Sequence, residues 1–117
     1  MPMTPARVRK FALSLANARE APHMARVAFR TPRRIFATMA GDGAGDGADV
    51  NLMFDADLQA HYCAMAPEAF APVPGGWGRM GATRCDLKIV DKATFRSALA
   101  AAHARANAPL PKRKSTK

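Results

Sequence analysis

The side chains best suited to chemistry in this chain are its cations and its single tryptophan. Eighteen lysines and arginines stand against nine acids, so the formal net charge is +9. Trp77 and Arg79 lie in a segment rich in glycine and proline, Pro72–Gly81. Aromatic rings and arginines recur at binding surfaces, because a ring stacks on flat groups and a guanidinium bonds to anions. The alternative is that Trp77 packs over the edge of the core, since large aromatics are mostly buried.

The charges are unevenly distributed along the chain. Residues 1–34 have a net charge of +7, residues 35–78 one of −6, and residues 79–117 one of +8. Basic regions of this kind favour nucleic acid or an acidic partner, whereas scattered cations would only keep the protein soluble. The acidic middle segment contains Asp55, Asp57 and Glu68, and it would suit a basic protein partner instead.

Two predicted strands have cations at their polar positions, Arg26 and Arg30 on one and Arg84 and Lys88 on the other. These cations would form a basic patch if the polar positions of both strands share the uncovered face of one sheet. Lysine and arginine contacts to phosphates give weak, salt-dependent and sequence-tolerant affinity, so we expect DNA or RNA as the partner. The alternative is a protein-interaction module that binds no nucleic acid. The predicted nucleic-acid contacts are Arg26, Arg30, Arg33, Arg34, Trp77, Arg79, Arg84, Lys88, Lys112, Arg113 and Lys114.

No set of residues favours catalysis. The three histidines lie on separate predicted elements, and Glu20 near His23 is the one candidate acid–base pair. The segment Gly41–Asp49 is rich in glycine and aspartate but lacks the spacing of a calcium loop, so we interpret it as a solvated connection. We therefore expect a non-enzymatic protein with no metal and no cofactor.

Cysteine usage and hydropathy predict a cytoplasmic protein. Cys63 and Cys85 lie on separate predicted elements, so we expect two free thiols, with Cys85 buried. No apolar run approaches the roughly 20 residues that a membrane helix needs. The apolar stretch Phe11–Ala16 is shorter than a signal peptide requires, and we interpret it as part of a folded helix.

Periodicity and turn residues predict the elements that position these side chains. Helices are expected after the capping residues Thr4, Asp55 and Asp91. Strands are expected at 26–30, 35–40, 50–54 and 84–89, with the first two forming a hairpin that has Arg33 and Arg34 at its tip. Ala18–Ala25 is interpreted as a connector, and Pro72–Gly81 as a shaped loop, not a helix.

These elements predict one α+β domain over residues 1–109, followed by a disordered basic tail over residues 110–117. The expected order is α-β-β-β-α-β-α. Short connections imply an antiparallel sheet with helices packed on one face.

Several stretches of the chain resemble the MmcQ/YjbR-like family of small bacterial proteins. The most specific is Pro67–Phe70 followed by Pro74–Arg79, and the likeness covers residues 3–107. The weaker matches are Phe11–Leu15, Pro22–His23, Arg34–Thr38 and Val50–Leu52. The resemblance implies a CyaY-like, or frataxin-like, α+β fold and a DNA-binding role.

Overall fold

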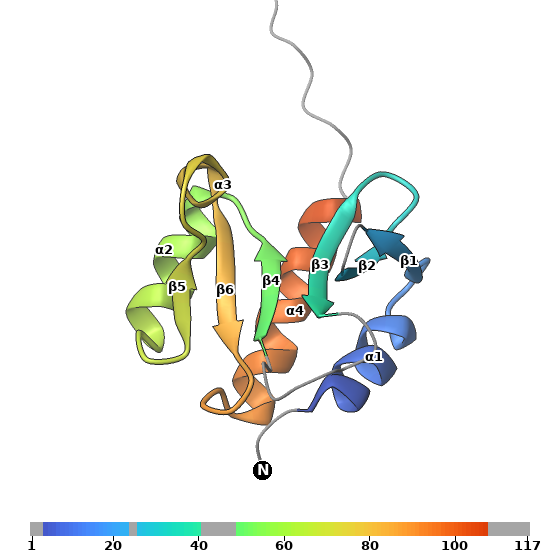
Figure 1. The fold of residues 1–117 in the computed structure, drawn as a ribbon, viewed down its shortest axis with the longest axis horizontal. Coiled ribbons are helices and arrows are strands. Elements are labelled where there is room, and N and C mark those ends of the chain that lie inside the picture. Colours follow the sequence, from blue (N-terminus) through green and yellow to red (C-terminus); the bar gives the residue numbers. More distant parts are fainter. Residues whose placement is uncertain (1–3, 24–25, 41–48, 108–117) are drawn as a thin grey trace, which may run out of the picture.

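The computed structural model describes residues 4–23, 26–40 and 49–107, which form one antiparallel sheet with helices beside it (Figure 1). The helices are α1 (Pro5–Ser14), α2 (Ala56–Met65), α3 (Gly76–Met80) and α4 (Lys92–Asn107). The strands are β1 (Arg19–His23), β2 (Arg26–Arg30), β3 (Ile35–Ala40), β4 (Asp49–Met53), β5 (Phe70–Pro72) and β6 (Ala82–Asp86). Residues 41–48 of the predicted connection and the tail at 110–117 lie outside the described residues.

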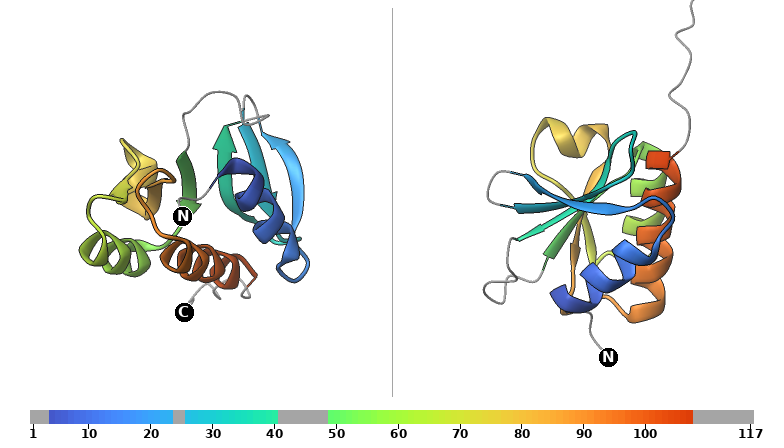
Figure 2. Two further views of the ribbon diagram at one scale, coloured as in Figure 1. Left: turned by 90° about the horizontal axis from the view of Figure 1, so that it is seen from below. Right: turned by 90° about the vertical axis from the view of Figure 1, so that its right-hand side faces the viewer.

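The six strands are ordered β1-β2-β3-β4-β6-β5, and every neighbouring pair is antiparallel. Helices α1, α2 and α4 cover one face of the twisted sheet, as Figure 2 shows. The predicted α+β class is therefore confirmed. The predicted order lacked three of the elements, namely β1, β5 and α3.

Strands β2 and β3 form the predicted hairpin. Val27 pairs with Met39 and Phe29 pairs with Ala37, and Phe29 and Met39 are buried on the helix side of the sheet. The register shifts at Phe29–Arg30, which is a bulge. The bulge lets the consecutive residues Phe36 and Ala37 both enter the core.

Helix α4 provides the largest apolar face packed on the sheet. The helical spacing of its apolar residues predicts a buried stripe, and all four residues of that stripe are fully buried, namely Phe95, Leu99, Ala102 and Ala106. The alanines keep this helix close to β3 and β4, while burial of each larger side chain stabilises the fold by about 1.5–3 kcal/mol. Helix spacing in the sequence therefore identified the core side of α4 correctly.

Capping residues set the starts of α1 and α2 as predicted. The Thr4 hydroxyl accepts the backbone N–H of Arg7 at 3.2 Å, and the Asp55 carboxylate accepts that of Leu58 at 2.9 Å. Each bond satisfies a donor that the first helical turn leaves without a backbone partner. The spacing of Leu58, Tyr62 and Met65 predicts a buried stripe on α2, but Met65 is 51% exposed, because it is the last residue of that helix.

The segment interpreted as a connector is the edge strand β1. Glu20 pairs with Phe29 and Pro22 with Val27 across the β1–β2 ladder. Its sequence, Arg-Glu-Ala-Pro-His, has no strand alternation, and proline is tolerated only at a sheet edge. Pairing with β2, not local propensity, makes this segment a strand.

The last strand, β6, begins and ends earlier than the predicted strand over residues 84–89. After Asp86 the chain turns, and the Asp86 carboxylate accepts the N–H of Lys88 at 2.9 Å. An aspartate that bonds two residues ahead favours a turn. Leu87 and Val90 are buried beside this turn, whereas Ile89, which continued the predicted alternation, is 50% exposed.

Candidate nucleic-acid interface

Trp77 lies on the short helix α3, where the sequence predicted a loop. Gly75 precedes this helix with φ 85°, and Gly81 ends it with φ 124°, a backbone angle that favours glycine. The N–H of Gly81 donates to the Gly78 carbonyl at 3.1 Å. Two of the glycines that suggested a loop therefore form the boundaries of a single helical turn.

Contacts of its backbone hold α3 in place. A Cβ built on Gly78 would lie 1.7 Å from the Val73 carbonyl oxygen, so only glycine permits this approach. The Gln59 side-chain amide of α2 donates to the carbonyls of Gly78 at 2.9 Å and Ala82 at 3.0 Å. Helix α3 is thus fixed by its buried side, and Trp77 is turned toward solvent.

Trp77 is 54% exposed, so the structure has the ring at the surface and not packed over the core edge. Its neighbour on α3, Met80, is 75% exposed, and Arg79 is exposed as well. A cavity of about 300 Å³ opens beside the ring. Its lining residues are Met53, Phe54, Trp77, Met80, Ala82 and Arg105.

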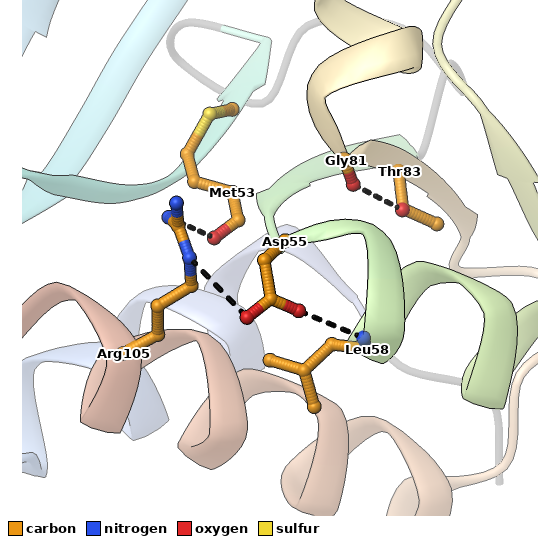
Figure 3. A network of polar contacts seen from close by, with 6 residues as sticks. All are labelled: Met53, Asp55, Leu58, Gly81, Thr83 and Arg105. Carbon is orange, nitrogen blue, oxygen red and sulfur yellow. Dashed lines mark hydrogen bonds and ion pairs between the residues drawn. The ribbon is translucent and has the colours of Figure 1, made fainter.

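Arg105, near the end of α4, is the cation of this cavity, and the sequence analysis did not select it. Its Nη1 donates to the Met53 carbonyl at 3.2 Å, and its Nε lies 3.9 Å from Oδ2 of Asp55, as Figure 3 shows. The other oxygen of Asp55 caps α2. The guanidinium is therefore held at the edge of the Trp77 cavity. The sequence signal that could have identified Arg105 is its position on α4 outside the apolar stripe, which predicts that its side chain faces away from the core.

Thr31 fixes the arginine-rich tip of the β2–β3 hairpin. This residue is fully buried, and its hydroxyl accepts the backbone N–H of Arg33 at 3.1 Å and of Arg34 at 3.2 Å. The hydroxyl also donates to the Ala106 carbonyl of α4 at 3.2 Å. Arg30 Nε donates to the Thr31 carbonyl at 3.1 Å. The tip is thereby attached to the end of α4.

The last turn of α4 connects the hairpin tip with the tryptophan. Ala106 contacts Thr31, and the adjacent Arg105 lines the Trp77 cavity. Figure 1 shows α3, the end of α4 and the β2–β3 turn along the upper edge of the molecule, with α3 at the left and the β2–β3 turn at the right. We call this region the tryptophan–arginine surface, and its members are Arg30, Arg33, Arg34, Trp77 and Arg105.

The polar phases of β2 and β6 lie on the same face of the sheet, opposite the buried Phe29 and Leu52, but they are not adjacent. Two strands separate β2 from β6, a distance of about 14 Å between the strand axes. Arg84 is paired with Asp49 at 3.0 Å, and Lys88 lies in the turn after β6. The polar phases of β2 and β6 thus supply separated cations. The Arg26 side chain and the tail cations Lys112, Arg113 and Lys114 lie outside the described residues.

The groups considered for catalysis have structural contacts. Glu20 binds Arg9 through two bonds of 2.9 and 3.1 Å, which together raise the pKa of the Arg9 guanidinium. A ring nitrogen of His103 donates to the Ala16 carbonyl at 2.7 Å. The His23 side chain lies outside the described residues, as does any pairing it makes with Glu20. Within the described ranges, no three histidine, cysteine, aspartate or glutamate side chains gather closely enough to hold a metal.

Both thiols are free in the structure, and Cys85 is buried as predicted. Burial, and then the nearby carboxylates of Asp86 and Asp49, raise the pKa of the Cys85 thiol to about 12. Burial also raises the pKa of Cys63, which lies half-buried on α2.

Comparison with known proteins shows a likeness of fold. No family model and no curated protein matches the sequence. The structure is similar to the crystal structure of Deinococcus radiodurans protein DR2400, which is described as a DUF419 domain. The TM-score is 0.67 at 17% sequence identity, over 85% of this chain and 75% of that one. Among the described residues, no helix has the length and apolar character that crossing a membrane requires.

Proposed function

We propose that this protein binds nucleic acid with little sequence preference through the tryptophan–arginine surface. The supporting observation is that its one tryptophan is 54% exposed on α3, which shares an edge of the fold with the arginine-rich hairpin tip. A ring that stacks on bases, beside guanidinium groups that bind phosphates, is the combination that single-strand binders use. The role is one of binding and not of catalysis.

Exposure of this ring works against stability. Apolar surface left in water forgoes about 25 cal/mol for each Å² that burial would have removed. The ring is nevertheless held outward, because the Gly78–Val73 contact and the Gln59 bonds fix α3. Trp77 and Met80, which is 75% exposed, lie on the same rigidly held helix, and an exposed apolar patch of this kind favours a binding role.

Unpaired strands suit this surface better than duplex DNA. In a duplex the faces of the bases are stacked on each other, so Trp77 has no free base face to contact. Arginine contacts to phosphate are available in both forms. We therefore expect single-stranded DNA or RNA to bind more tightly than a duplex of the same length.

Fluorescence anisotropy with labelled oligothymidine and a matched duplex, each at two salt concentrations, tests the proposal. The protein should end at residue 109, so that Lys112, Arg113 and Lys114 cannot supply the affinity. Trp77→Ala should weaken single-strand binding by about 5- to 150-fold, the equivalent of 1–3 kcal/mol for one stacked base. The change should be much smaller for the duplex.

A charge-matched pair of variants tests the arginines. Arg33→Gln with Arg34→Gln should weaken binding and reduce the slope of log affinity against log salt by about 0.7 for each lost phosphate contact on a single strand. Arg84→Gln with Lys88→Gln removes the same charge elsewhere and should change binding little. Equal losses in the two double variants would refute a localised surface and leave only a net-charge effect.

A protein partner is the second candidate. Met80 is 75% exposed, and Met53 and Phe54 line the cavity beside Trp77, so part of this surface is apolar. Absence of binding to either nucleic acid at low salt would favour this candidate. We also propose, from the resemblance at Pro67–Arg79, that the chain is a cytoplasmic member of the MmcQ/YjbR-like family.

A further inference from the structure

A groove between α1 and the first turns of α4 gathers four cations. Its volume is about 480 Å³, and among the described residues no acid lines it. The lining residues are Arg7, Lys10, Phe11, Ser14, Lys92 and Arg96. Figure 2 shows the first turns of α1 and of α4 side by side on the helical face of the domain. The sequence analysis did not assign a role to this set.

Two regular helix faces build the groove. Arg7, Lys10, Phe11 and Ser14 follow the spacing i, i+3, i+4 and i+7, so they share one face of α1. Lys92 and Arg96 are four residues apart on α4 and face the same space. The Arg96 guanidinium lies over the Phe11 ring at 4.8 Å from its centroid, a cation–π contact that joins the two walls.

Two cations of the groove lie where they destabilise their own helices. Arg7 lies in the first turn of α1 and Lys92 is the first residue of α4, where the helix dipole opposes positive charge. Neither helix has an acid in its first turn, although Asp91 directly precedes Lys92 at the start of α4. Within the described part of the chain, none of the four makes an ion pair, whereas Arg9 on the next face of α1 binds Glu20. Local conflicts of this kind are typical of functional sites.

We propose that this groove binds a small phosphorylated compound with two or more phosphate groups. Its volume lies within the range of about 300–1,000 Å³ that is usual for small-molecule sites. Arginine forks and lysine ammonium groups are the side chains that bind phosphate, and the groove has two of each. An organic group attached to the phosphates would contact Phe11 together with the Arg96 guanidinium that lies over its ring.

The number of cations favours a polyphosphate over a monophosphate. One phosphate group has a charge of about −1.5 to −2 near neutral pH, so it balances only half of the four positive charges. A di- or triphosphate balances most of them. Nucleoside polyphosphates and inorganic polyphosphate share this chemistry and differ in whether an organic group reaches Phe11.

The groove is separate from the tryptophan–arginine surface. Lys92 and Arg105 are thirteen residues apart on α4, which places them about 20 Å apart along the helix axis. Ligands at the two places need not compete, so failure of one proposal leaves the other intact. Trp77→Ala should leave polyphosphate binding unchanged.

Isothermal titration calorimetry of the intact protein at low salt, without divalent metal, tests the proposal. ATP and inorganic tripolyphosphate should each bind once per chain, and AMP should bind at least about tenfold more weakly, because it offers fewer charge-assisted bonds. Tighter binding of ATP than of tripolyphosphate would indicate that the organic group contacts Phe11. Equal affinity would assign the site to the phosphates alone.

Matched variants localise the binding. Lys10→Gln with Lys92→Gln should lower the affinity for tripolyphosphate at least about tenfold, since two charge-assisted contacts are lost. Lys10→Arg with Lys92→Arg should retain binding, and Arg84→Gln with Lys88→Gln controls for net charge. Equal losses in the two Gln pairs, or the absence of saturable binding by ATP and tripolyphosphate, would overturn the proposal. Saturation by oligothymidine alone would overturn it too, because the ligand would then be a strand.

Discussion

Replacing Gly78 by alanine is a direct test of how the tryptophan is held at the surface. The added Cβ would lie 1.7 Å from the Val73 carbonyl oxygen and 2.8 Å from its carbonyl carbon. Both are backbone atoms, so no side-chain rotation relieves the overlap. Either α3 or the segment around Val73 must move, and Gln59 then loses its bonds to Gly78 and Ala82.

The expected cost follows from these contacts. Insertion of a methyl group into a packed site costs about 1–3 kcal/mol. Two lost hydrogen bonds add about 0.5–1.5 kcal/mol each. Alanine returns about 1 kcal/mol through its higher helix propensity. The net loss is therefore about 1–5 kcal/mol, a large part of the roughly 5–15 kcal/mol that stabilises a typical domain.

Gly76→Ala is the matched control, because it lies on the same helix in open space. The nearest atom to its added Cβ is Arg79 Nη2 at 3.9 Å, an ordinary contact. Urea unfolding followed by Trp77 fluorescence reports on α3 directly, since the chain has one tryptophan. Gly78→Ala should shift the midpoint to lower urea and Gly76→Ala should leave it equal or higher. Equal midpoints in the two variants would refute the close-approach explanation.

Two further changes test the hairpin tip and the thiols. Thr31→Val should lower the free energy of unfolding by about 1–3 kcal/mol and weaken nucleic-acid binding, because it leaves the buried partners of the hydroxyl unsatisfied. Thr31→Ser keeps the hydroxyl, so it should retain both the stability and the binding in the same unfolding and anisotropy assays. A thiol reagent should modify Cys63 in the folded protein and Cys85 only on unfolding, as followed by mass spectrometry. Because folding raises the pKa of Cys85 from 9.0 to about 12, its contribution to stability is complete below pH 9 and is lost as pH rises toward 12, and Cys85→Ala should reduce that loss.

Periodicity in the sequence predicted the parts of the fold where one element buries one continuous face. The stripe of α4 at Phe95, Leu99, Ala102 and Ala106 is such a case, and all four are buried. The β2–β3 hairpin is another, because its apolar alternation and short turn leave few other pairings. Local sequence and tertiary packing agree in these elements, which makes them predictable.

The missed elements depend on contacts between distant segments. Strand β5 is three residues long and pairs with β6 across the α3 segment, so it has no periodicity of its own. Helix α3 has glycines at three of its boundary or contact positions, Gly75, Gly78 and Gly81. Their spacing correctly indicated special backbone geometry. That the geometry is helical depends on the close approach to Val73 within the same segment and on Gln59, which lies 19 residues from Gly78 in the chain.

The cationic groove has a signal in the sequence, because several of its charges oppose the dipole of the helix that carries them. Cations near the start of α1 oppose the helix dipole, and Lys92 does the same on α4, more than 80 residues later. Each conflict alone is small, about 0.3–1 kcal/mol, and is common on protein surfaces. The structure places the cations of both helices on one groove. An anion bound there would make the net interaction of each cation with its surroundings favourable. Convergence of several small unfavourable charges on one space is therefore a stronger indication of an anionic ligand than any one of them in the sequence.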